Sequence, residues 1–183
     1  YSVYNRIARL TLLLKEVEHE VVEVDPFSEP SEAYLALHPF GRVPTLTHDG
    51  FALFETNAIT RYIDRAFQGR PLQPERAAIV GRMDQVISVI DAYGYWPMVR
   101  QVSSHGFFRN YFGEASDPEE VAAGLQKSRT VLSFLNGIAE KGEILNGRTL
   151  TLADMMRSRL MSCTFFSGMG SATPIEKPRF RSQ

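Results

Sequence analysis

Three short stretches of this sequence place polar groups where they could bind a small peptide and activate it. The first is Glu55-Thr56-Asn57, which follows a strand-like run and begins a helical pattern. The N-terminus of a helix carries unpaired N–H groups and partial positive charge, so it suits a carboxylate. The carboxylate of Glu55 suits an ammonium group, and together they match an amino-acid zwitterion. Taken alone, the pattern is more typical of a capped helix with an exposed glutamate.

The second stretch is Val43-Pro44. Pro44 lacks an N–H and is out of place inside a central strand, but it can begin a strand in the cis form. The backbone of Val43 would then be open to pair with an extended peptide, in the manner of an added strand. By itself, a Val-Pro pair usually marks only a turn.

The third stretch is Ser2, just before the first helical pattern. A hydroxyl at a helix N-terminus can donate a hydrogen bond to a bound thiolate, and the helix dipole favours that anion as well. The thiolate, not the thiol, is the nucleophile. Without further context, Ser2 is more typical of a simple N-cap.

The elements that must position these residues follow from apolar spacing and turn signals. Residues 5–16 predict a helix, 19–24 a strand, and 31–37 a short helix capped by Ser31. Residues 44–47 and 51–54 predict two strands joined at Asp49-Gly50, a pair that tolerates positive φ. A helix capped by Thr56 or Asn57 should then run to about residue 67. The predicted order is α, β, α, β, β, α.

The second half of the chain predicts helices only. Residues 68–74 contain one glycine and two prolines and read as a linker. Helical patterns cover 75–111 and 117–140, the latter entered through Asp117-Pro118. Thr151 and Asp154 predict a capping box, with the Thr hydroxyl accepting the third N–H and the Asp reaching back to the Thr N–H. Beyond residue 167 the sequence is irregular.

Two strings carry a resemblance to a known family. They are His-Pro-Phe-Gly-Arg-Val-Pro-Thr-Leu at 38–46 and Leu-Phe-Glu-Thr-Asn-Ala-Ile-Thr-Arg-Tyr-Ile at 53–63. At this separation they resemble the glutathione-site signature of the cytosolic glutathione transferases. The stretch 80–106 is similar to the fourth helix of bacterial-type or fungal members, and the Thr-x-x-Asp box is also shared. The resemblance covers roughly residues 2–155.

This resemblance implies a fold and a division of the chain. Residues 1–67 would form a thioredoxin-like α/β domain that binds glutathione, 68–74 a linker, and 75–183 an all-helical domain carrying the electrophile site. The family's first strand should precede Ser2, and its helical domain usually continues well beyond Asp154. We therefore expect the sequence to lack the first strand and to be short at its C-terminal end.

The resemblance also implies residue roles. Ser2, at the position of the thiol-activating residue, would make this a serine-type member. Glu55 and Thr56 would hold the γ-glutamyl end of glutathione, and Val43, before a cis Pro44, would pair with the cysteinyl backbone. Arg42 would meet the glycyl carboxylate. A second-substrate pocket would involve Tyr4, Tyr93, Trp96 and Arg100, although for most aromatic residues near the long helix packing in the core is the stronger expectation.

The composition of the chain limits its possible partners, its location in the cell and its metal sites. The net charge of −1 argues against a nucleic-acid or anionic-membrane partner, and no apolar run approaches the roughly 20 residues that span a bilayer. Cys163 is the only cysteine, so a disulfide within the chain is excluded and a cytosolic location is favoured. The scattered histidines predict no metal site, and His38 and His48 should be loop or surface residues.

The first hypothesis is therefore a glutathione transferase that activates glutathione as co-substrate for attack on a small apolar electrophile, as in detoxification. Glutathione-dependent isomerisation or dehalogenation would use the same residues. A non-catalytic interaction or dimerisation module is the second hypothesis, and a thiol–disulfide oxidoreductase is the last, because no cysteine stands at the helix entrance. By resemblance, the chain is expected to be a homodimer.

Overall fold

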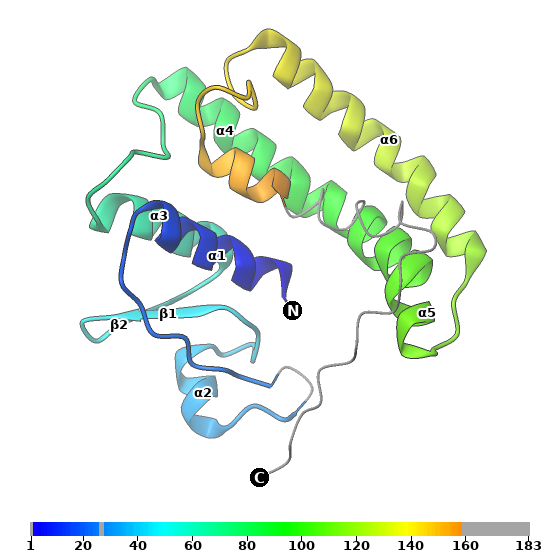
Figure 1. Ribbon diagram of the computed structural model, residues 1–183, viewed down its shortest axis with the longest axis horizontal. Coiled ribbons are helices and arrows are strands. Elements are labelled where there is room, and N and C mark those ends of the chain that lie inside the picture. Colours follow the sequence, from blue (N-terminus) through cyan, green and yellow to red (C-terminus); the bar gives the residue numbers. More distant parts are fainter. Residues whose placement is uncertain (1, 26–27, 159–183) are drawn as a thin grey trace.

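The first half of the chain folds into helices around a small antiparallel hairpin. The computed structural model describes residues 2–25 and 28–158. The elements of this half are α1 (Val3–Leu14), α2 (Glu32–Leu37), β1 (Thr45–His48), β2 (Phe51–Phe54) and α3 (Thr56–Ala66). In Figure 1, α1 and α3 lie on one side of the hairpin and α2 on the other.

The hairpin confirms the turn predicted from Asp49-Gly50. Thr45 pairs with Phe54 and His48 with Phe51. Asp49 and Gly50 have φ of 49° and 79°, the left-handed region that the pair was expected to supply. The two free ends of the hairpin, at Pro44 and Glu55, therefore lie opposite each other.

The strand predicted for residues 19–24 is wrong. This segment forms no ladder with any described residue, and Val22 is 77% exposed. Its β-branched residues have strand propensity, but a strand is stable only where a neighbour completes its hydrogen bonds. The described part of the chain offers it no such neighbour.

A small apolar cluster holds α1 and α3 together. Ala8 and Leu12 of α1 meet Ile59 and Ile63 of α3, all at most 6% exposed. From the hairpin side, Leu46 and Leu53 pack against the same cluster. The amphipathic spacing of both helices thus fixes how their N-termini are placed relative to the hairpin.

The second half is helical, as predicted, but not α-helical throughout. It contains α4 (Ala77–Val89), the π-helices η1 (Ile90–Gly94) and η2 (Trp96–Phe108), α5 (Arg109–Phe112) and α6 (Pro118–Lys141); residues 152–158 add a further helical segment. Pro97 has no N–H to give to the i−4 carbonyl, which locally favours departure from α geometry. Asp117 caps α6 as predicted, its carboxylate accepting from the N–H of Glu119 at 2.8 Å.

Helix α6 runs back alongside α4 and the π-helical segment (Figure 1). The approach is closest at Gly124. A Cβ placed there would lie 2.8 Å from the carbonyl oxygen of Pro97 and 2.8 Å from Cβ of Gln101. Only a glycine allows the two backbones to come so near.

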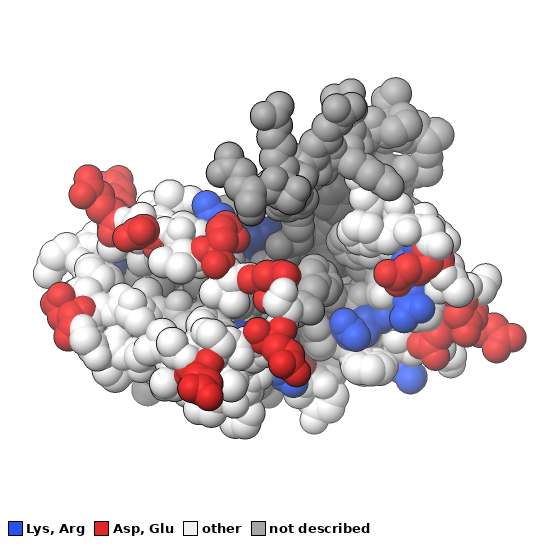
Figure 2. All heavy atoms as spheres, turned by 90° about the horizontal axis from the view of Figure 1, so that it is seen from below, with Lys and Arg blue, Asp and Glu red and all other residues white. Residues whose placement is uncertain are grey.

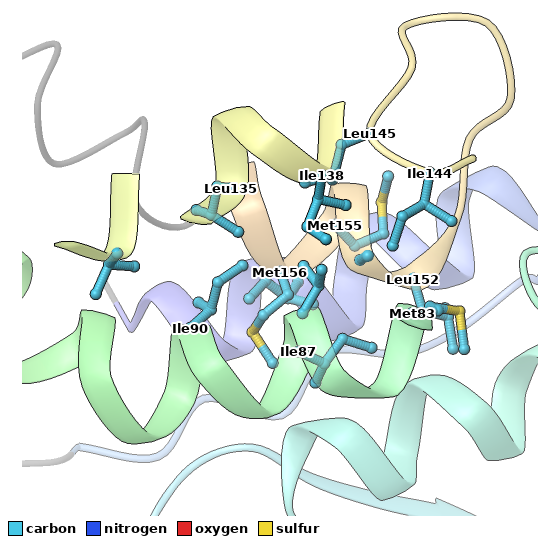
Figure 3. Close-up of a cluster of buried hydrophobic side chains, with 14 of the residues drawn as sticks. Met83, Ile87, Ile90, Leu135, Ile138, Ile144, Leu145, Leu152, Met155 and Met156 are labelled. Carbon is cyan, nitrogen blue, oxygen red and sulfur yellow. The ribbon is translucent and has the colours of Figure 1, made fainter. Parts of the chain in front are cut away.

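The main core lies between α4, α6 and residues 144–156, as Figure 3 shows. Its side chains are Met83, Ile87, Ile90, Leu135, Ile138, Ile144, Leu145, Leu152, Met155 and Met156, among others. Ile7 of α1 and Leu72 of residues 68–74 belong to the same cluster. Helix α1 therefore contributes to both apolar clusters and joins the two halves.

A buried ion pair fixes the linker to the first half. The Lys15 and Asp64 side chains, 2% and 4% exposed, approach to 3.1 Å. Asp64 also accepts hydrogen bonds from the N–H of Leu72 at 2.8 Å and from the N–H and side chain of Gln73 at 3.0 and 3.1 Å. Burial alone raises the pKa of Asp64, but the bonds from Leu72, Gln73 and Lys15, with the Lys15 charge, outweigh it and lower the pKa below its ordinary value.

The predicted capping box is present in modified form. The carboxylate of Asp154 accepts from the N–H of Thr151 at 2.9 Å, as expected. The Thr151 hydroxyl bonds to that same carboxylate at 2.9 Å, whereas the Asp154 N–H bonds to the Thr151 carbonyl at 3.0 Å. The irregular structure predicted beyond residue 167, and Cys163, lie outside the described residues.

Surface charge and helix length can be compared with the sequence expectations. Acidic side chains are scattered over the face seen in Figure 2, and basic ones occupy only a few places on it. Within residues 2–25 and 28–158, no helix has the length and apolar character to cross a membrane. In the same residues, no group of three or more His, Cys, Asp or Glu side chains could hold a metal ion.

Candidate functional site

The N-terminus of α1 presents Ser2. Its backbone is extended, with φ −68° and ψ 128°, and its Oγ accepts from the N–H of Asn5 at 3.5 Å. Ser2 is therefore the N-cap, as the simpler interpretation of the sequence predicted. Accepting this bond uses a lone pair of the oxygen and not its hydrogen, so the geometry is compatible with donation to a ligand.

The N-terminus of α3 presents Glu55 and Thr56, but the predicted cap is wrong. Glu55, not Thr56 or Asn57, holds the N-cap position, and its side chain makes no capping bond. Its φ of 68° turns the chain sharply from β2 into α3, so that the exposed carboxylate stands beside the first turn of the helix. Thr56 is the first helical residue and is 5% exposed.

The loop before β1 contains the predicted cis peptide bond between Val43 and Pro44. Gly41 precedes it with φ 59°, and a Cβ at Gly41 would lie 2.8 Å from Cγ of Pro30. Glycine is thus required here by backbone conformation and by space. Arg42 is exposed, and Val43 and Pro44 are half-buried.

The hairpin brings two of these predicted groups together. Because Thr45 pairs with Phe54, the next residues outward are Pro44 on one strand and Glu55 on the other. Val43-Pro44 and Glu55-Thr56 therefore flank the same end of a two-stranded ladder. The sequence signature separates them by only about ten residues because the hairpin is short.

Asp91 joins the N-termini of α1 and α3, and the sequence did not reveal it. The Tyr4 hydroxyl donates to Oδ1 of Asp91 at 3.2 Å, and the Asn57 amide donates to Oδ2 at 3.5 Å. Asp91 lies in η1, 87 residues from Tyr4. No local pattern signals a contact across such a distance, because Asp91 is one acidic residue in the middle of the helical pattern predicted for residues 75–111.

The residues predicted for a second-substrate pocket do not all come together. Tyr4 contacts the ring of Tyr95, with centroids 5.6 Å apart. Tyr93 and Trp96 are 67% and 59% exposed, so these two are not the core residues that the sequence had favoured. Arg100 is exposed too, and all three side chains therefore lie on the surface.

Two open surface hollows lie elsewhere. One is lined by Leu13, Val17, Glu18, His19 and Glu20, and the other by Arg129, Thr130, Ser133 and Phe134. Neither contains a residue of the predicted glutathione site.

His38 was expected to be a loop or surface residue; it lies in the loop after α2, but it is not on the surface. It is 2% exposed, and its ring stacks on Phe54 with centroids 4.6 Å apart. His48 is half-buried, and its Nδ1 is 2.7 Å from the hydroxyl of Tyr62. Phe54 packs against the His38 ring, and Tyr62 and Phe67 pack against the ring of His48, the last residue of β1, so both rings are less exposed than expected.

Known proteins that are similar to this chain show which family it belongs to. A family model described as the glutathione S-transferase N-terminal domain matches residues 1–71. Glutathione S-transferase F9 of Arabidopsis thaliana is 30% identical over 152 residues, covering 81% of this chain and 70% of that protein. The chain belongs to the glutathione S-transferase family.

Further relatives of the family extend the likeness to other organisms and to the fold. Glutathione S-transferase hmp2 of Hypomyces subiculosus is 31% identical over 153 residues, covering 80% of this chain and 71% of that protein. The crystal structure of a glutathione S-transferase from Rhodospirillum rubrum F11 superposes with a TM-score of 0.77. That match covers 91% of this chain and 76% of that chain at 22% identity, and shows the shared fold.

Proposed function

We propose that this transferase binds glutathione across the end of the hairpin and activates its thiol at Ser2. The observation that carries the proposal is the convergence of Val43-Pro44, Glu55 and the α3 N-terminus at one end of a two-stranded ladder. Such a surface offers a strand edge for a peptide backbone next to paired sites for a zwitterion.

Each residue of the proposed site binds a different group of glutathione. The carboxylate of Glu55 receives the γ-glutamyl ammonium, and the first N–H groups of α3, with Thr56, receive its carboxylate. The backbone of Val43 pairs with the cysteinyl unit. Arg42, an exposed cation beside it, meets the glycyl carboxylate.

Ser2 makes this a serine-type member. Its hydroxyl donates to the glutathione sulfur, and the N-terminus of α1 adds a partial positive charge; both lower the pKa of the thiol. The thiol proton passes to water, and the thiolate attacks a small apolar electrophile to form a carbon–sulfur bond. Either a leaving group departs with the pair of its broken bond, or the π pair of an activated double bond moves to its electron-withdrawing group, which water then protonates. Tyr4, Tyr93, Trp96 and Arg100 are the residues that we assign to the electrophile.

The remaining assignments follow the family. Residues 1–67 form the glutathione-binding domain, 68–74 the linker and 75–183 the helical domain. The protein acts as a cytosolic homodimer with glutathione as co-substrate. The similarity of residues 80–106 to bacterial-type or fungal members stays part of this proposal; similar proteins occur in the plant Arabidopsis thaliana as well as in Hypomyces subiculosus.

Calorimetric titration with glutathione tests the proposal. The unaltered protein should bind glutathione in the micromolar to millimolar range. Glu55→Ala should abolish measurable binding, because the ammonium group loses its counter-charge. Glu114→Ala, which removes an exposed glutamate of the helical half, is the matched control and should bind as the parent does. A folded parent that does not bind glutathione would refute the proposal and favour a non-catalytic interaction module.

A further inference from the structure

The hydroxyl of Tyr34 contacts the chain on both sides of Val43-Pro44. Tyr34 lies in α2, and its Oη is 2.6 Å from the carbonyl oxygen of Arg42 and 3.2 Å from Oγ1 of Thr45. A phenol has a single hydrogen, which the Arg42 carbonyl can only accept. The Thr45 hydroxyl must therefore donate to Oη. One side chain thus bridges the residue before the Val-Pro pair and the residue after it.

Helix α2 has few other means of fixing this loop. It is six residues long and has no buried residue. Ser31 caps it by accepting from the N–H of Tyr34 at 3.2 Å, which sets the backbone of Tyr34 but not the loop. The hydrogen bonds of the phenol are consequently the direct polar link between α2 and the backbone around Val43.

The same ring belongs to a row of aromatic contacts that ends beside Glu55. Tyr34 stacks against His38 with centroids 6.3 Å apart, and His38 stacks on Phe54 at 4.6 Å. Phe54 pairs with Thr45 in the hairpin and immediately precedes Glu55. Tyr34 is therefore placed to fix the spacing between the strand edge at Val43 and the carboxylate at Glu55.

We propose that Tyr34 is a positioning residue for glutathione, holding the backbone of Val43 in the place where it pairs with the tripeptide; this rests on the proposed function above. Tyr34 does not act on the thiol, because its hydrogen bonds end at residues 42 and 45 and not at Ser2. Its loss should consequently weaken binding of glutathione and leave the chemical step at saturation almost unchanged.

Tyr34→Phe tests this because it keeps the ring and removes only the hydroxyl. A half-exposed neutral hydrogen bond contributes modestly, so the KM and Kd for glutathione should rise about threefold to tenfold. The kcat at saturating glutathione should stay within about twofold. Thr45→Val removes the other partner, and the double variant should be less affected than the product of the two single effects, because both act through one bond.

Tyr62→Phe is the matched control. It removes a phenol hydroxyl from the same domain, one that contacts Nδ1 of His48 at the opposite end of the hairpin. If Tyr34→Phe raises the Kd and Tyr62→Phe does not, the proposal holds. An unchanged Kd in Tyr34→Phe, or an equal rise in both variants, would overturn it. Should Tyr34→Phe fail to fold, Thr45→Val takes its place in the same comparison.

Failure of the two proposals can be told apart. A folded parent protein that does not bind glutathione removes the proposed function, and the role of Tyr34 with it. A parent that binds, with a Tyr34→Phe variant of equal affinity and equal KM, removes the role of Tyr34 alone. Thermal unfolding of each variant shows whether a change in Kd accompanies general loss of stability, which would also speak against positioning.

Discussion

Replacing Asp64 by alanine is expected to destabilise the protein more than replacing its partner Lys15 by methionine. The two side chains form a buried ion pair, so each substitution removes the same salt bridge. The two variants differ in the polar groups that are left without a partner in the buried site. Asp64→Ala leaves the Lys15 ammonium buried with only the carbonyl oxygens of residues 64 and 70 as acceptors, and removes the acceptor of three further donors.

The expected losses in the free energy of unfolding follow from that difference. An uncompensated buried charge costs about 3–5 kcal/mol, so Asp64→Ala should lose that much. In Lys15→Met, the carboxylate keeps its bonds from Leu72 and Gln73, and the methionine fills much of the volume of the lysine stem. The carboxylate loses one hydrogen bond, worth about 1.5–3 kcal/mol, and the carbonyl oxygens of residues 64 and 70 each lose a donor. The middles of the two ranges differ by roughly 2 kcal/mol, so Asp64→Ala should be the less stable variant.

Urea unfolding measures the difference. The midpoints should fall in the order parent, Lys15→Met, Asp64→Ala, with similar slopes so that the shifts report stability and not a change in the denatured state. Equal midpoints for the two variants, or the reverse order, would refute the reasoning, since they would mean that the bonds from residues 72 and 73 contribute nothing to holding the carboxylate.

The same group predicts a pH dependence. The pKa of Asp64 is lowered in the folded protein, so between that value and the unfolded pKa of about 3.9 the unfolded chain binds more protons. Stability should be fully present above the unfolded pKa and fall as the pH drops toward the folded pKa. Asp64→Asn removes this contribution, so its stability should change less than that of the parent between about pH 5 and pH 2. An identical slope in both would contradict the role assigned to this carboxylate.

Four further substitutions test the site and the packing. Ser2→Ala should lower the rate of glutathione conjugation roughly 10²-fold in a spectrophotometric assay, because it removes a donor to the thiolate, and an unchanged rate would exclude that role. Gly41→Ala must adopt a left-handed φ at a cost of about 1–2 kcal/mol, so calorimetry should find severalfold weaker glutathione binding. Gly124→Ala should lower the free energy of unfolding by about 1–3 kcal/mol, measured by thermal unfolding. Gly137 is in the same helix, but a Cβ there meets nothing within 4 Å, so Gly137→Ala should raise the free energy of unfolding by up to about 1 kcal/mol. Equal effects of the two substitutions would refute the close approach of α6.

The elements predicted well are those whose signals are local. Asp49-Gly50 supplies positive φ within four residues of chain, and Asp117-Pro118 supplies a cap and a first helical residue side by side. Ser31 likewise caps α2 through a bond to a residue only three positions on. In each case the energy that fixes the element is available before the rest of the chain folds.

The wrong predictions share a different cause. The strand at residues 19–24 had the propensity but needed a neighbouring strand, which local sequence does not describe. Thr56 has the better side chain for a cap, yet Glu55 takes the position because the turn out of β2 fixes its backbone. His38 lies in a loop, as expected, but Phe54 of the hairpin packs against its ring, so it is buried and not on the surface.

The candidate site combines both kinds of information. Val43, Pro44, Glu55 and Thr56 were readable because one short hairpin brings them together, and the family strings mark them. Asp91, which ties together the N-termini of α1 and α3, was not readable, because its position depends on how η1 packs against the first half. Helix α6 also contacts η1, and it packs closely against η2 at Gly124. The groups proposed to bind glutathione are thus encoded locally, but the geometry between Ser2 and Glu55 is maintained by contacts that only the complete fold creates.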